Sequence, residues 1–228
     1  MKFLLLLAGV DGTYSPDGQF FAYTTLGTPT FYTSTLSGQP SLDPVLPDSQ
    51  PYLQLMDRQD GEIILSLPAI SNINAMDFNF PLYETGLSFS PDSRYLAFLT
   101  SGEVQVDANN WPVSVITMTD QVFINLLDLQ DQRLLWSAPA NKWSDLSWSP
   151  TSSYLAYQNQ SEDWQLLDIH HQKILPVTKA GGSNVYRLEW SFDGRYLSLL
   201  ACYILPNQGC DYHTVIFDVT HGIMSVEP

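Results

Sequence analysis

Four histidines, two cysteines and 24 acidic side chains are the groups in this 228-residue sequence that could do chemistry. Paired carboxylates can hydrolyse glycosides, but the spacing does not bring Asp77, Glu103, Asp107 and Asp163 within reach of one another. No Gly-x-Ser-x-Gly elbow, His-Glu-x-x-His helix, phosphate-binding glycine loop or calcium loop occurs. We therefore predict a protein that is not an enzyme and that holds no metal and no cofactor.

The two cysteines, Cys202 and Cys210, enclose the turn-forming residues 206–209. This spacing suits a disulfide that closes a loop, whereas the Cys-x-x-Cys spacing of redox and zinc sites is absent. Two unpaired thiols are the alternative. A disulfide favours a periplasmic or extracellular location, and unpaired thiols favour the cytoplasm.

The chain is strongly acidic, with 9 Lys and Arg against 24 Asp and Glu, a net charge of −15 and a pI near 4.2. Such a field repels phosphate backbones and anionic lipids, so we expect no nucleic-acid partner. Residues 3–8 form an apolar run after Lys2, which indicates either a short secretory signal or a terminal strand. Elsewhere no stretch approaches the roughly 20 apolar residues of a membrane span.

An internal repeat decides the fold class. An aromatic residue before a serine, a polar turn and a resumed apolar run recur in segments 12–23, 87–98, 146–157 and 188–199. Each segment is typical of a strand, a tight turn and a second strand. Another pair of apolar strands follows, and the first of them ends at Asp57, Asp128, Asp168 or Asp218.

Ser149 and Ser191 lie 42 residues apart, which is the size of a four-stranded propeller blade. We predict an all-β fold, a β-propeller of four-stranded antiparallel blades with about four blades present. The expected blades cover residues 11–81, 82–142, 143–182 and 183–228, after a signal-like segment or closing strand at 1–10.

The Ser-Pro-Asp-Gly motif is intact at 15–18, drifts at 90–93 and 149–152, and keeps Ser191, Asp193 and Gly194 in the last copy. It resembles the repeats of TolB-like, WD40-like β-propellers. The resemblance implies a propeller scaffold, usually of six or more blades, so the four units form either a small ring or part of a larger one. The aspartates of both patterns are predicted to accept backbone hydrogen bonds in turns.

Blade connectivity divides the loops between two sides of the propeller. In a blade of antiparallel strands a, b, c and d, the a–b and c–d turns lie on one side, and the b–c loops and d–a links lie on the other. From repeat serine to c-strand aspartate the four units span 42, 38, 19 and 27 residues, so the b–c loops of units one, two and four are lengthened. We call this the long-loop side and predict that it binds a ligand.

The candidate ligand contacts are the aromatic, amide and acidic residues of these loops. They are Tyr32, Phe78, Tyr83, Asp107, Asn110, Trp111, Trp143, Tyr203 and Tyr212. An equally weighted interpretation is that many of the aromatics fill small cores under the loops.

Aromatic rings beside carboxylates and amides suit a protein, peptide or glycan partner. We therefore predict a non-catalytic binding module. The alternative, which follows from the resemblance, is the propeller portion of a prolyl oligopeptidase-like or dipeptidyl peptidase-like serine hydrolase whose catalytic domain is missing from this chain. An incomplete ring would expose strand edges, and an oligomer is expected in that case.

Overall fold

The computed structural model describes residues 12–26, 51–68, 86–107, 110–141, 144–177, 184–205 and 209–227. In these residues the regular structure is β-sheet, arranged as four antiparallel sheets of four strands. The prediction of an all-β chain built from four propeller blades is confirmed. The N-terminal segment 1–10 lies outside the described residues.

The four sheets follow one another along the chain and are called blades 1 to 4. Blade 1 comprises β1 (Gly12–Tyr14), β2 (Phe20–Leu26), β3 (Pro51–Asp57) and β4 (Ile63–Pro68). Blade 2 comprises β5 (Leu87–Phe89), β6 (Tyr95–Asp107), β7 (Asn110–Asp128) and β8 (Arg133–Pro139). Blade 3 comprises β9 (Ser147–Trp148), β10 (Tyr154–Gln158), β11 (Trp164–Asp168) and β12 (Lys173–Pro176). Blade 4 comprises β13 (Asn184–Trp190), β14 (Tyr196–Leu205), β15 (Gly209–Asp218) and β16 (Ile223–Glu227).

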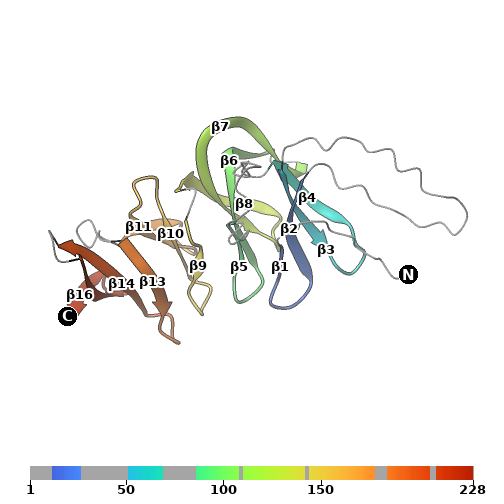
Figure 1. Cartoon of the computed structure of the whole chain (residues 1–228). Helices are drawn as coiled ribbons and strands as arrows, with labels where there is room; N and C mark the ends of the chain where they lie inside the picture. The colour runs from blue at the N-terminus through green and yellow to red at the C-terminus, as the bar shows by residue number, and fades with distance from the viewer. Residues whose placement is uncertain are drawn as a thin grey trace, which may run out of the picture.

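Strands pair in sequence order within every blade, which gives the a, b, c, d order of a propeller. Figure 1 shows the blades side by side in a row, with blade 1 at the right and blade 4 at the left. The a–b turns all lie on the lower side, whereas the β6–β7 hairpin rises on the upper side. The lower side is called the short-turn side, and the upper side is the long-loop side.

The repeat serine builds the a–b turn of each blade. In blade 1 the Ser15 hydroxyl donates to Asp17 Oδ1 (2.6 Å) and accepts from the amide of Phe20 (2.9 Å). A serine hydroxyl accepts the amide five residues later in the other blades as well, at Ser90, Ser149 and Ser191. The motif is therefore structural: it closes the turn before the b strand begins.

The fourth residue of the turn fixes neighbouring blades against each other. It has a positive φ in every blade, which favours Gly or a small polar residue. Its hydroxyl accepts an amide from the preceding blade, from Asp17 at Ser93 (2.9 Å) and from Asp92 at Ser152 (3.0 Å). At Gly194 a Cβ would lie 3.0 Å from Thr151 Oγ1, so blade 3 packs directly on the backbone there.

The turn aspartates accept backbone hydrogen bonds, as the sequence predicts. Asp17, Asp92 and Asp193 each accept the amide two residues later, in the a–b turns. The aspartates that end the c strands accept the amide two residues later in the c–d turns, at Asp57, Asp128, Asp168 and Asp218. These contacts confirm the prediction that both sets of carboxylates are turn acceptors.

The hydrophobic core consists of three clusters, and each lies between two successive blades. Leu53 and Leu55 of blade 1 pack with Phe98 of blade 2, and equivalent clusters join blade 2 to blade 3 and blade 3 to blade 4. In the described part of the chain, no cluster joins blade 4 back to blade 1. The four blades form an open arc, and its two ends lie far apart in Figure 1.

Candidate functional site

The predicted ligand contacts fall into three groups. Tyr32, Phe78, Tyr83 and Trp143 lie outside the described residues. The backbones of Asp107, Asn110, Trp111 and Tyr203 lie in β6, β7 and β14, and their side chains are outside the described part. Tyr212 in β15 is 53% exposed.

The long-loop side is built from two extended hairpins. In blade 2 the strands β6 and β7 stay paired as far as Asp107 and Asn110. In blade 4 the strands β14 and β15 stay paired as far as Leu205 and Gly209. Blade 3, between them, ends its pairing at Gln158 and Trp164. Hairpins of two blades therefore project beyond the blade that separates them.

The prediction that Asp107, Asn110 and Trp111 lie in a loop is wrong, because β6 ends at Asp107 and β7 begins at Asn110. Tyr203 and Tyr212, also predicted in a loop, lie in β14 and β15. Four of the five residues at 113–117 are β-branched, which explains the difference, since such residues favour a strand and let the hairpin continue outward. Register shifts between Ser101 and Glu103, and again near Asp107, bend the hairpin as β-bulges do. The extra chain thus forms sheet and not irregular loop.

A buried polar network fixes the base of the blade 2 hairpin. Asn125 is fully buried; its Nδ2 donates to Thr100 Oγ1 (2.8 Å) and its Oδ1 accepts from the Ser137 hydroxyl (2.8 Å). The Thr100 hydroxyl continues to the carbonyl of Gly102 (2.8 Å), where the register shifts. Satisfied buried networks of this kind hold a unique geometry, so the hairpin has a rigid base.

Other blades carry a polar residue at the same c-strand position. Gln54 donates to the Ser66 hydroxyl (2.9 Å) in blade 1, and Gln165 accepts from Tyr157 (2.6 Å) in blade 3. Burial raises the pKa of the Tyr157 hydroxyl, so it stays protonated and donates. No sequence pattern described above marks these residues. The signal that could have found them is an amide three residues before the c-strand aspartate, which blades 1 to 3 have and blade 4 replaces with Val215.

The blade 4 hairpin holds the cysteines. Cys202 is 1% exposed, is disulfide-bonded, and pairs in register with Tyr212. The only other cysteine of the sequence is Cys210, which pairs in register with Ile204. Next to Tyr212, His213 Nε2 lies 2.9 Å from Asp211 Oδ2, so charged and aromatic groups share this hairpin.

The short-turn side carries most of the described ion pairs; the others are His213 with Asp211 on the blade 4 hairpin and Arg187 with Glu189 in β13. The fully buried Asp128 accepts from Arg94 Nη2 (2.8 Å) and Nε (3.2 Å). Burial alone would raise the pKa of the Asp128 carboxyl, but Arg94 and the amides of Asp131 and Gln130 outweigh burial and lower it. The arrangement holds a c–d turn against the b strand and keeps the Asp128 carboxylate ionised.

The histidines of this side also serve the turns. His171 Nδ1 lies 2.9 Å from Asp168 Oδ2, and His221 Nδ1 lies 3.0 Å from Asp218 Oδ2. The Thr220 hydroxyl is the main cause that lowers the pKa of the Asp218 carboxyl, helped by His221 and Arg195. Among the described residues, no group of three His, Cys, Asp or Glu side chains could hold a metal ion. Nor does any described helix have the length and hydrophobicity to cross a membrane.

Comparison with known proteins supports the architecture. No family model and no curated protein matches the sequence. The structure is similar to the β-propeller domain of the trilobed protease from Pyrococcus furiosus, with a TM-score of 0.53, 13% identity, 96% of this chain covered and 56% of that chain. It is also similar to hydrazine synthase of Kuenenia stuttgartiensis, with a TM-score of 0.50, 14% identity, 95% of this chain covered and 53% of that chain.

These likenesses show the propeller fold and nothing finer, because the identities are low. The chain spans little more than half the length of either solved structure. No catalytic constellation accompanies the fold among the described side chains. What the geometry offers is a rigid array of blades with two hairpins raised on one side.

Proposed function

We propose that this chain is a non-catalytic β-propeller module of the TolB-like type that binds a protein, peptide or glycan on its long-loop side. The observation that carries the proposal is the projection of the β6–β7 and β14–β15 hairpins beyond blade 3. Surfaces raised on a rigid scaffold are where such folds place their binding residues. The similarity to a protease's propeller domain concerns the fold alone, so a link to a hydrolase is not part of the proposal.

The composition of the hairpins fits this role. Trp111 lies near the tip of the blade 2 hairpin, and Tyr203 and Tyr212 lie on the blade 4 hairpin. Aromatic side chains supply contact area to sugars and peptides at a low cost in conformational entropy. The net charge of −15 favours cationic partners over anionic ones. The disulfide at Cys202 is consistent with a working location in the periplasm or outside the cell.

The test uses the full chain against a glycan microarray and a phage-displayed random peptide library. Hits are then measured with Trp111→Ser and Tyr212→Ser, which we expect to weaken binding at least about tenfold. The matched control is Phe192→Ser, because Phe192 is 97% exposed but lies in an a–b turn on the short-turn side. Equal affinity of both hairpin variants and the wild type would contradict the proposed site, as would loss of binding in the control.

A further inference from the structure

The junctions between blades repeat one aromatic contact. Tyr95 at the start of the blade 2 b strand stacks on Trp148 at the end of the blade 3 a strand, with ring centroids 6.2 Å apart. Tyr154 stacks on Trp190 in the same way at the next junction, at 6.4 Å. Trp148 Nε1 also donates to the Ser88 carbonyl of blade 2 (3.2 Å). These two of the three junctions thus use a b-strand tyrosine of one blade and an a-strand tryptophan of the next; the junction of blades 1 and 2 has Phe20 and Phe89 at the two positions.

The same two positions recur at the ends of the arc. Tyr196 of blade 4 corresponds to Tyr95, but it is 37% exposed and Tyr95 is 5% exposed. Tyr14 of blade 1 corresponds to Trp148, but it is 58% exposed and Trp148 is 9% exposed. Within the described part of the chain, neither ring stacks on an aromatic from another blade. The two halves of a further junction are therefore present, one at each end.

An open hollow lies beside Tyr196 on the end face of blade 4. Its volume is about 500 Å³, which is in the range that accepts a large side chain. It is lined by Glu189, Trp190, Ser191, Tyr196, Ser198 and Ile216. In the interior blades the place of Ser198 is taken by Ala97 and Ala156, which are fully buried against the next blade. The hollow is thus where the next blade of a propeller would pack.

The end face of blade 1 exposes Tyr14 and Arg58 at its short-turn end, with the Arg58 guanidinium 5.0 Å from the Tyr14 ring centroid. Phe21 and Tyr23, farther along the same face, are already buried within the single chain, so the exposed part is confined to the short-turn end. The residue after the c-strand aspartate is apolar and buried in the other blades, where it is Leu129, Ile169 or Val219. In blade 1 this residue is the exposed Arg58, so the face ends in a positive charge.

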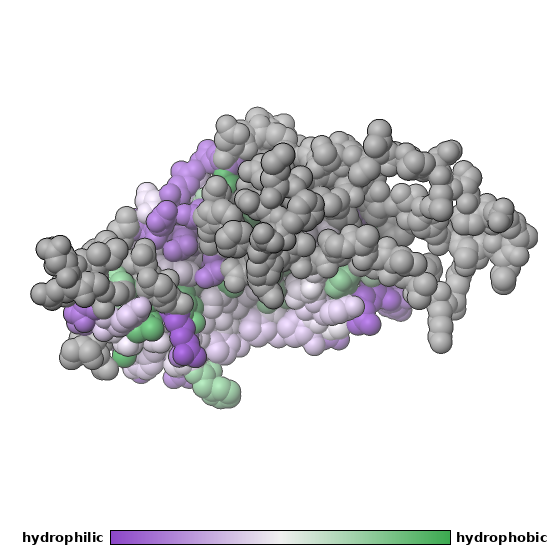
Figure 2. All heavy atoms as spheres, viewed as in Figure 1, coloured by the Kyte–Doolittle hydropathy of each residue, from purple (hydrophilic) through white to green (hydrophobic). Residues whose placement is uncertain are grey.

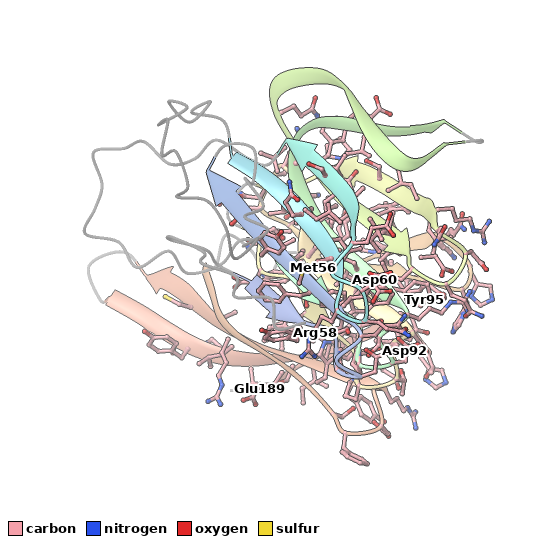
Figure 3. The ribbon with its side chains drawn as sticks, turned by 90° about the vertical axis from the view of Figure 1, so that its right-hand side faces the viewer. Met56, Arg58, Asp60, Asp92, Tyr95 and Glu189 are labelled. Carbon is pink, nitrogen blue, oxygen red and sulfur yellow. The ribbon has the colours of Figure 1, made fainter. Side chains whose placement is uncertain are left out.

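The two end faces carry opposite charges at equivalent positions of the repeat. Glu189 of blade 4 stands at the repeat position of Ser88, whose carbonyl meets the next blade's Trp148. Tyr14 stands at the position of Trp148, so a blade docked on blade 4 with Tyr14 would bring Arg58 to Glu189. Figure 3 shows Arg58 on blade 1 and Glu189 on blade 4, both in the lower, short-turn half of the arc.

We propose that the end face of blade 4 docks on the end face of blade 1 of a second copy, head to tail, so that two chains close a ring of eight blades. Tyr196 of one copy stacks on Tyr14 of the other, and Glu189 pairs with Arg58. The partner that docks on each end face is a second copy of this chain, because one chain carries both halves of the junction. Two-fold symmetry makes both contacts identical and closes the assembly.

The test measures the mass of the full chain by light scattering after size exclusion, between about 1 and about 100 µM. We expect two copies of 25.6 kDa. Tyr196→Asp should give a single copy, because it places a carboxylate in the junction. The matched control is Ile174→Asp, since Ile174 is 38% exposed but lies on the outermost strand of blade 3. It should keep the two-copy mass.

Charge reversal tests the contact without touching the aromatic rings. Glu189→Arg and Arg58→Glu each set like charges against each other and should weaken dimerisation at least about tenfold. An equimolar mixture of the two variants restores an opposite pair at both junctions and should recover the two-copy mass. Both side chains are exposed in the single chain, where Glu189 pairs with Arg187 and Arg58 donates to the Gly18 carbonyl. Circular dichroism of each variant alone therefore checks that the loss of these contacts leaves the fold intact. Because two copies of charge −15 repel each other, added salt should strengthen the wild-type dimer.

Three results would overturn the proposal. A wild-type mass of one copy at every concentration means that the ends do not pair between chains. A two-copy mass that survives Tyr196→Asp means that the contact lies elsewhere. Failure of the mixed charge variants to recover the dimer, with both variants folded by circular dichroism, means that Glu189 and Arg58 do not meet. None of these readouts depends on the binding partner of the long-loop side.

Discussion

Two tryptophans at equivalent positions allow one hydrogen bond between blades to be measured against an internal reference. Trp148 and Trp190 stack on equivalent tyrosines at centroid distances of 6.2 and 6.4 Å. Trp148 Nε1 donates to the Ser88 carbonyl, whereas the buried Nε1 of Trp190 has no partner among the described residues. Replacing each by phenylalanine removes the same atoms from similar surroundings, so the difference between the variants reports the indole N–H.

The magnitude follows from the two environments. Trp148→Phe loses a hydrogen bond worth about 0.5–1.5 kcal/mol, and Trp190→Phe removes a buried donor whose desolvation costs about 1–3 kcal/mol. Both variants lose similar packing, so the loss in unfolding free energy should be greater for Trp148→Phe by about 1.5–4.5 kcal/mol, the sum of the two effects. For a chain of this length the melting temperatures should then differ by about 3–18 °C.

The assay is urea unfolding followed by far-ultraviolet circular dichroism, because the fluorescence of the two variants would differ for trivial reasons. The urea dependence of the unfolding free energy must be the same in both variants for the comparison to hold. Equal destabilisation would refute the reasoning, and so would a larger loss for Trp190→Phe. Either result would mean that the indole N–H of Trp190 finds a partner equivalent to Ser88.

Three further predictions follow from the turns and the disulfide. Asp128→Ala should cost about 2–4 kcal/mol in chemical unfolding, since it leaves Arg94 without its buried carboxylate, and Asp57→Ala should cost under about 1 kcal/mol, since that carboxylate holds one turn amide; equal losses would contradict this. The urea midpoint should stay level from pH 7 to about 5 and fall below about pH 4. Carboxylates whose pKa is lowered by folding stabilise the protein fully above their unfolded-state pKa, and this stabilisation is lost as the pH falls through their folded-state pKa. A midpoint that rises in acid would contradict this prediction. These carboxylates are those of Asp17, Asp128, Asp168, Asp193 and Asp218. If Cys202 pairs with Cys210, the non-reduced mass should be about 2 Da lower than the reduced mass, and Cys202→Ser should cost about 2–3 kcal/mol; an unchanged mass on reduction would exclude the pairing.

The fold could be predicted from the sequence because the features that define it are local. A serine hydroxyl that closes its own turn needs only residues within five positions, as at Ser15 and Phe20. The extension of the strand beyond Ser101 was harder to predict. The number of residues in a repeat shows that a blade has extra residues, but it does not show whether those residues pair as strands. Pairing from Glu103 to Asn110 depends on register shifts that no local pattern announces.

The candidate site was predictable only as a side of the propeller. Antiparallel order places the b–c connections together, but it does not say which residues rise above their neighbours. The network of Asn125, Thr100 and Ser137 illustrates the limit, because its members come from three strands. A polar residue in an apolar strand becomes meaningful only when the register shows what it faces. Long-range register is set by packing of whole blades, which the sequence of one blade does not contain.

The ends of the arc combine both kinds of information. Once the repeats are aligned, the sequence alone shows Arg58 where the other units have Leu129, Ile169 and Val219. Its meaning comes from the structure, which buries those three residues against the preceding blade. A charge at such a position is costly if another apolar blade covers it and is favourable if the covering blade brings a carboxylate. Glu189 at the opposite end is such a carboxylate. Arg58 and Glu189, which both depart from the repeat, therefore favour contact between the two ends of the arc.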